Sequence, residues 1–232
     1  MPVPETVLAE LGSIDTPTVC NALEAVAPQR RGYGYTTRTL MCLRPELKPM
    51  VGFARTASIR SAHPGDLAGE PARELSNAYY AYIEKGPGPS IVVIHDMDEH
   101  PGYGAFWGEV NSAIHKGLGC LGLITDGSVR DLPDVAEGFQ MLAAEVVPSH
   151  AYVHVVDFGR PVNVAGMRVR DGDLVHADRH GAVVIPIDVA GKVVGAARLI
   201  QARERVIIDA ARAPGFSVDK LRAAQGRAAE IH

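Results

Sequence analysis

The chain has 232 residues, of which 47% are hydrophobic and 22% are charged, so it can form one large domain with a buried core. Its formal net charge of −4 argues against nucleic acids and anionic membranes as partners, because both attract basic surfaces. With no membrane-spanning apolar run, no signal-peptide pattern in MPVPETVLAELG and 3 scattered cysteines, we expect a soluble cytoplasmic protein.

The first predicted helix covers DTPTVCNALEAV, residues 15–26. Asp15 or Thr16 can cap this helix, Pro17 suits its first turn, and its apolar residues recur at helical spacing. Residues 30–40 are rich in glycine and predict a loop.

The middle of the chain alternates strand and helix patterns. Residues 51–60 predict a strand, and residues 74–86, ELSNAYYAYIEKG, predict a helix that ends at a glycine. SIVVIHD, residues 90–96, is typical of a strand buried on both faces. A helix begins near Gly108 in GEVNSAIHKGLG, and the apolar run CLGLI that follows it predicts the next strand.

The second half begins with a loop and short helix over residues 128–139, followed by a strand over residues 141–148, MLAAEVVP. Residues 152–186 contain several short strand patterns separated by glycine and aspartate turns, with no helix between them. A long helix over residues 189–213 and a polar segment over residues 217–232 complete the chain.

This order of elements predicts an α/β protein that lacks the regular alternation of a Rossmann fold. We expect one domain over residues 1–186 and a C-terminal helical arm over residues 187–232, packed on the domain or on a neighbouring subunit. The arm carries a broad apolar face that includes Val193, Val194 and Ile207. Such a face predicts a closed homo-oligomer, most simply a trimer or a pair of trimers.

Two predicted strands end in charged loops, IVVIHDMDEH and CLGLITDGSVRD, and a helix lies between them in sequence. Ligands of open α/β sheets bind beyond the carboxyl ends of strands, near helix N-termini. Free amides in the first helical turn favour a carboxylate, and Arg130 offers a two-pronged contact to the same group. Asp131 offers hard oxygen ligation to a magnesium-like ion, and Glu109 could hold a water of that ion. The amides concerned are those of Gly108, Glu109, Val110 and Asn111.

Other interpretations of the polar residues remain open at this point. Asp126 and Gly127 together also form an ordinary tight turn after a strand. The cluster HDMDEH, residues 95–100, is dense enough for a histidine-based metal site, and His150 and His154 would share one face of a strand. His176 and His180 fit structural or pocket-lining roles. Cys120 fits a buried, inert thiol, and Tyr79, Tyr80 and Tyr82 fit core or interface positions.

Three blocks of the sequence match the motifs of one protein family. GLITDGSVRD, residues 122–131, has the form G-x-x-x-D-G-x-x-R-D, and a Gly-Glu pair opens the helix upstream of it. A late G-D-x-x-x-A-D block within residues 172–186 ends in an isoleucine-proline strand. With TPTVCNALEA at the first helix, these blocks resemble the RraA-like family over most of the chain. That family includes class II 4-hydroxy-4-methyl-2-oxoglutarate/4-carboxy-4-hydroxy-2-oxoadipate aldolases, oxaloacetate decarboxylases and the ribonuclease E inhibitor.

The resemblance implies a lyase that cleaves a C–C bond of a 2-oxo acid and releases pyruvate, with Mg²⁺, Mn²⁺ or another divalent cation as cofactor. It implies that Arg130 contacts the substrate, that Asp131 binds the metal and that Glu109 orients a metal-bound water. The backbone from Gly108 to Asn111 would hold the pyruvate part. A non-catalytic oligomeric regulator similar to the ribonuclease E inhibitor is the alternative function.

The resemblance also implies a fold and an assembly. The fold is a β/β/α sandwich resembling the swivelling phosphohistidine domain, assembled as trimers or hexamers with sites between subunits. An acid from a neighbouring C-terminal region could correspond to Glu204, although no motif marks that position. The chain departs from the family where Arg179 and His180 replace acids of many members, so the physiological substrate stays open.

Overall fold

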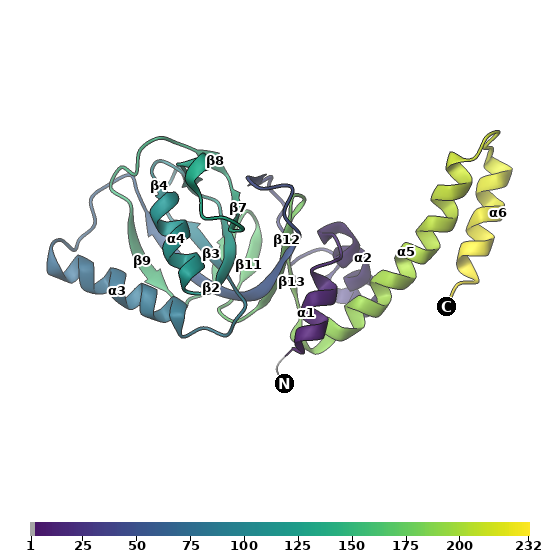
Figure 1. The fold of residues 1–232 in the computed structure, drawn as a ribbon, viewed down its shortest axis with the longest axis horizontal. Coiled ribbons are helices and arrows are strands. Elements are labelled where there is room, and N and C mark those ends of the chain that lie inside the picture. The colour runs from purple at the N-terminus through teal and green to yellow at the C-terminus, as the bar shows by residue number, and fades with distance from the viewer. Residues whose placement is uncertain (1–2) are drawn as a thin grey trace.

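The computed structural model describes residues 3–232. The chain forms a large mixed sheet with helices against it, and two C-terminal helices extend away from this body (Figure 1). The predicted α/β class is therefore confirmed. Among the described helices, none combines the length and the apolarity needed to cross a bilayer.

The helices follow the predicted order with two additions. Asp15 caps the second helix as expected, because its side chain accepts a hydrogen bond from the amide of Thr18 at 2.8 Å. The first helix was not predicted, since it is short, and the last was predicted only as a polar arm. The helices are α1 (Glu5–Leu11), α2 (Thr16–Val26), α3 (Glu70–Glu84), α4 (Glu109–Gly117), α5 (Ala190–Arg212) and α6 (Val218–Ala229), with short 3-10 turns η1 (Pro28–Arg30), η2 (Leu132–Asp134) and η3 (Ile187–Val189).

The large sheet has a parallel centre and antiparallel edges. Across the sheet its strands are β1 (Met41–Cys42), β7 (Gln140–Ala143), β5 (Cys120–Thr125), β3 (Ser90–Asp96), β2 (Met50–Arg60), β12 (Leu174–Asp178) and β13 (Gly181–Ile185), and β9 (His154–Phe158) also pairs with β2. The pairings among β2, β3, β5 and β7 are parallel, whereas the other pairings in this sheet are antiparallel.

Two smaller sheets accompany the large one. One contains β4 (Ala105–Trp107), β6 (Ser128–Val129) and β8 (Glu145–Val146), and the other is the hairpin of β10 (Val162–Val164) and β11 (Met167–Val169). The single strand predicted over residues 141–148 was wrong, because the chain leaves the large sheet at Ala144, whose amide donates to the carbonyl of Gly127 at 3.1 Å. A continuous apolar run does not reveal such a change of sheet.

The large sheet is buried on both faces. In β3, Ile91 and Val93 pack into the cluster that the β10–β11 hairpin covers, whereas Val92 and Ile94 pack into the cluster beneath α3 and α4. This arrangement is the predicted β/β/α sandwich. A third cluster joins α1, α2 and the beginning of α5 to β12 and β13.

Helix α5 contributes to the core of its own chain. Val193, Val194 and Ala197 are buried with α1 and α2, so these residues are not available to cover a neighbouring subunit. This finding corrects part of the argument for an exposed apolar face. The distal half of α5 instead packs on α6 (Figure 1), and the guanidinium of Arg203 donates to the carbonyl of Ile231 at 2.8 Å. The division of the chain after Pro186 stays a prediction.

Candidate functional site

Strands β4 and β6 bring the beginning of α4 beside the segment that follows β5. Trp107 pairs with Val129, and the amide of Arg130 donates to the carbonyl of Trp107 at 2.8 Å. Trp107 is fully buried, so it anchors this junction in the core beneath α4. The two segments that the sequence predicted to converge therefore lie side by side.

Asp131 contacts both of these segments. Its Oδ2 lies 3.3 Å from the amide nitrogen of Glu109 and 3.5 Å from Nε of Arg130. The backbone of Asp131 is left-handed, with φ of 53°, a conformation that aspartate adopts more readily than most residues. Its side chain is 40% exposed and that of Arg130 is 36% exposed, so both groups remain accessible to a ligand.

Gly108 leaves space for the carboxylate of Asp131. A Cβ atom at this position would collide with Oδ2 of Asp131, and the φ of Gly108 is −166°, an extended value that any residue adopts. The requirement for glycine is therefore one of space and not of backbone conformation. The contact with Asp131 thus explains why a glycine precedes Glu109 at the beginning of α4.

The side chain of Asn111 points into the protein. Its Nδ2 donates to the carbonyl of Phe106 at 2.5 Å, and its Oδ1 accepts from the hydroxyl of Tyr80 at 2.8 Å. These contacts fix the junction between β4 and α4. The sequence placed Tyr80 only in the core or an interface, because no local pattern links α3 to α4.

The first turn of α4 presents backbone donors. The first intrahelical bond runs from the amide of Ser112 to the carbonyl of Gly108 at 3.0 Å, so the three preceding amides have no partner of that kind. The N-cap residue, Gly108, has no side chain that could accept these amides. The carboxylate of Asp131 accepts a hydrogen bond from the amide of Glu109. The amides of Val110 and Asn111 can therefore bind an anion. Val110 is itself 69% exposed.

The donor set at this site fits a hard cation that needs few protein ligands. Both contacts of Asp131 involve Oδ2, so Oδ1 can ligate a metal, and Glu109 offers a second exposed carboxylate on the adjacent turn. Magnesium commonly binds through one or two carboxylates and keeps several waters. Within residues 3–232 no group of three or more His, Cys, Asp or Glu side chains is placed to hold a metal. The carboxylates of Asp131 and Glu109 are fewer than the four protein ligands of a structural zinc site.

The acidic and histidine-rich residues at the end of β3 and in the loop after it form hydrogen bonds within the protein. Nδ1 of His95 lies 2.9 Å from Oδ2 of Asp126, and this hydrogen bond raises the pKa of His95. Asp126 is buried and also accepts from the amide of Asp96 at 3.0 Å. Asp98 accepts from the amide of Ser61 at 2.6 Å. These contacts favour a structural role for Asp126 at the strand end.

His176 and His180 have partners within the fold. His176 is buried, which lowers its pKa, and its Nε2 lies 2.9 Å from the carbonyl of Ile14. Nδ1 of His180 lies 3.1 Å from Oδ1 of Asp178. His150 lies before β9 and His154 begins it, so the prediction that both lie on one strand was wrong.

Helix α5 directs its distal half away from the body that carries α4 (Figure 1). Glu204 lies in this exposed distal half. An acid at this position could complete the site only on another subunit, so its role stays a prediction.

The family comparison agrees with the motifs. The model of the RraA-like family, described as Aldolase/RraA, matches residues 16–184. This range includes α4, Arg130 and Asp131.

Two curated relatives give different coverage. A Halalkalibacterium halodurans protein named "Putative 4-hydroxy-4-methyl-2-oxoglutarate aldolase" is 27% identical over 179 residues, which are 72% of this chain and 84% of that protein. The uncharacterized protein MJ0644 of Methanocaldococcus jannaschii is 31% identical over 105 residues, 44% of this chain. The match spans only 50% of the length of that archaeal relative.

A solved structure shares the fold. Streptomyces coelicolor RraAS2, described as an unusual member of the RNase ES inhibitor RraA protein family, superposes with a TM-score of 0.69. The superposition covers 88% of this chain and 97% of that chain at 22% identity. At this identity the similarity shows the fold alone.

Proposed function

The chain belongs to the RraA-like family, and on this premise we propose that it is a divalent-metal-dependent lyase that releases pyruvate from a 2-oxo acid. The reaction is retro-aldol cleavage of a 4-hydroxy-2-oxo diacid or decarboxylation of oxaloacetate. The observation that carries the proposal is that Oδ2 of Asp131 contacts both the amide of Glu109, at the N-terminus of α4, and Nε of Arg130. Oδ1 of the same carboxylate is then a hard oxygen ligand beside a helix N-terminus and an arginine.

The residues of the chain have distinct roles in this reaction. The amides of Val110 and Asn111 bind the carboxylate next to the 2-oxo group, and the guanidinium of Arg130 holds it in a two-pronged contact. Asp131 would hold the cation, with Glu109 and water completing its surroundings. A bound divalent cation supplies Lewis-acid stabilisation of the negative charge that develops on the 2-oxo oxygen.

Proton transfers accompany the C–C cleavage. In the retro-aldol reaction the C4 hydroxyl loses its proton, the C3–C4 bond breaks, and its electron pair passes to the pyruvate enolate. C3 then accepts a proton and pyruvate leaves. Glu109 is exposed on the first turn of α4. A water that Glu109 holds there can accept the proton of the C4 hydroxyl and then deliver a proton to C3.

The proposed assembly is a homotrimer or homohexamer whose sites lie between subunits. The open first turn of α4 and the projection of α5 and α6 from the body support this proposal (Figure 1). A second subunit could then supply Glu204 to the site and cover it from water.

A coupled assay tests the proposed activity. Purified protein is given oxaloacetate with Mg²⁺, and pyruvate is measured through NADH oxidation by lactate dehydrogenase. Because oxaloacetate also decarboxylates slowly with Mg²⁺ alone, the Asp131→Asn variant at equal concentration is the matched control. We expect release above that control. A rate equal to the control, repeated with 4-hydroxy-4-methyl-2-oxoglutarate, would favour the non-catalytic oligomeric regulator instead.

A further inference from the structure

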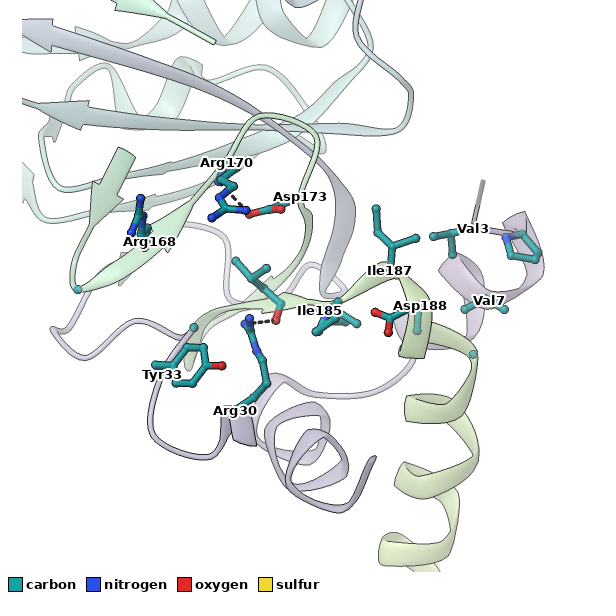
Figure 2. Close-up of a pocket in the computed structure, with 17 residues that line it drawn as sticks. Val3, Val7, Arg30, Tyr33, Arg168, Arg170, Asp173, Ile185, Ile187 and Asp188 are labelled. Atoms are coloured by element: carbon teal, nitrogen blue, oxygen red, sulfur yellow. Dashed lines mark hydrogen bonds between the residues drawn. The ribbon is translucent and has the colours of Figure 1, made fainter. Parts of the chain in front are cut away.

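A large cavity lies outside the proposed lyase site, and Figure 2 shows the residues that line it. Its volume is about 1190 Å³, large enough for a small organic ligand, and its lining includes none of the residues assigned to that site. It is formed by η1, the end of β13, η3 with the beginning of α5, the beginning of α1 and the segment from β11 to β12.

Two arginines on one wall share a face of the chain. In β11 and the residue after it, Met167 and Val169 are buried, whereas Arg168 and Arg170 alternate with them and point outward. Within residues 3–232 neither guanidinium forms a salt bridge. The alternation therefore places two like charges on one face, an arrangement that an anionic ligand would stabilise.

A third arginine is held in place from the opposite wall. The guanidinium of Arg30 donates to the carbonyl of Val184 at 2.9 Å and lies 5.0 Å from the ring centre of Tyr33. Gly34 has φ of +90°, and a Cβ atom there would collide with this guanidinium. Nε of Arg30 is buried without a partner among the described residues. Arg30 is thus fixed at the cavity by its contacts with Val184 and Tyr33.

The opposite end of the cavity carries several apolar side chains, with Asp188 beside them. In Figure 2, Val3, Val7 and Ile187 lie on the side away from Arg30 and Arg168, and the side chain of Ile187 is 42% exposed. Two aspartates also line the cavity, but they are outnumbered by the three arginines. One of them, Asp173, accepts a hydrogen bond from the backbone amide of Arg170 at 2.8 Å.

We propose that this cavity binds an amphipathic organic anion. Its carboxylate or phosphate contacts Arg30, Arg168 and Arg170, and its apolar body lies against Val7 and Ile187. Burial of the apolar body and charge-assisted hydrogen bonds to the head group act together, so an anion without an apolar body or a neutral apolar molecule binds more weakly. This site is independent of the proposed lyase activity.

The test uses decanoate as the probe with the full-length protein and isothermal titration calorimetry. We expect saturable binding of decanoate, affinity lower by about tenfold or more for decanol, and no detectable binding of acetate at the same concentrations. The double variant Arg168→Gln/Arg170→Gln should weaken decanoate binding by about tenfold or more. Both residues are exposed, so the fold should be retained, which circular dichroism checks.

Arg160→Gln is the matched control, because Arg160 is exposed and lies outside the cavity. It should bind decanoate like the unaltered protein, whereas Ile187→Glu should bind it less tightly through loss of the apolar end. Absence of decanoate binding, or equal binding by the double variant and Arg160→Gln, would overturn the proposal. Acetate binding as tightly as decanoate would also overturn it, as would exclusion of decanoate by a contact between two copies of the chain.

Discussion

Nε of Arg130 lies 3.5 Å from Oδ2 of Asp131, although consecutive side chains of an extended chain point in opposite directions. The contact forms because the left-handed backbone of Asp131, with φ of 53°, turns its side chain back. The same oxygen accepts the amide of Glu109 at 3.3 Å. One carboxylate oxygen thus fixes Arg130 relative to the helix N-terminus that we propose to bind the substrate.

Asp131→Ala should abolish binding of the divalent cation and lower pyruvate release by about 100-fold or more, because it removes the proposed metal ligand. Titration of Mg²⁺ into the protein by calorimetry measures the binding directly. Asp134→Asn is the control in the same loop, since Asp134 contacts Asp131 only through its backbone amide. Full activity after treatment with a chelator, or unchanged Mg²⁺ binding in Asp131→Ala, would contradict the assignment.

Arg130→Lys should lower kcat/KM by roughly 10- to 100-fold, because lysine keeps the charge but loses the planar fork that grips a carboxylate. Steady-state kinetics with oxaloacetate check this value. The loss should be smaller with Arg130→Lys than with Arg130→Ala, which removes the charge as well. Unaltered kinetics in both variants would remove Arg130 from the site.

Gly108→Ala should inactivate the protein while it remains folded, because the added methyl group displaces the carboxylate of Asp131. Gly117→Ala is the control at the other end of α4, where a Cβ atom has nothing within 4 Å. The control should keep its activity and gain up to about 1 kcal/mol of stability. Pyruvate release measures the loss of activity, and thermal unfolding of both variants measures the change in stability. An active Gly108→Ala protein would show that the position of Asp131 is not required.

The parallel unit of β3, α4 and β5 could be predicted from the sequence because its determinants are local. Apolar runs mark the strands, glycines bound the helix, and strand ends on one edge of a sheet meet in space. This topology predicts the proximity of Arg130 to the beginning of α4, and the pairing of β4 with β6, which was not predicted, fixes it. Short elements such as α1 and β8 could not be predicted, since a few residues carry no clear period.

Other features depend on contacts between residues far apart in sequence. The hydrogen bond of Tyr80 to Asn111 links α3 to α4, and no sequence pattern in either helix predicts it. The collision that excludes a side chain at Gly108 depends on the backbone conformation of Asp131. Burial of Val193 beneath α2 likewise requires the path of α5, which the apolar period alone does not specify.

The stability of the protein should fall as the pH decreases from about 6.5 to about 4, because burial lowers the pKa of His115 to about 4. The neutral ring lies 2.8 Å from the hydroxyl of Tyr79 and 2.7 Å from the carbonyl of Asn111. Because the pKa is lower in the folded state, this contribution is complete above pH 6.5 and is lost as His115 gains a proton. Its size is roughly 3 kcal/mol.

Urea unfolding at a series of pH values measures this effect. His115→Gln should flatten the pH dependence between pH 4 and 6.5, whereas Tyr79→Phe should lower stability but keep the slope, since His115 still titrates. A residual slope in His115→Gln is expected, because burial also lowers the pKa of His176. An unchanged slope in His115→Gln would contradict the assignment of the acid sensitivity to this residue.

Helix α6 should be required for assembly and for activity but not for folding of the rest of the chain. In the single chain α6 packs on α5 away from the body (Figure 1), and Ile208, Phe216 and Val218 are exposed around this hairpin. Truncation after Ala213 keeps Val193 and Val194 in the core, whereas truncation after Pro186 removes both and should unfold the N-terminal helices. Light scattering should show a trimer or hexamer for the full chain and a smaller, inactive species after the truncation at Ala213.

Mixing two inactive variants tests whether the sites lie between subunits. If Glu204 acts on a neighbouring site, Glu204→Gln should assemble but be inactive because the neighbouring site lacks this acid. Asp131→Ala should be inactive because its own site lacks the proposed metal ligand. Oligomers reassembled from both variants then contain some sites with an intact Asp131 from one subunit and an intact Glu204 from the other, so activity should reappear. Mixed oligomers that stay inactive, or an unaltered chain that is monomeric and fully active, would place the complete site within one subunit.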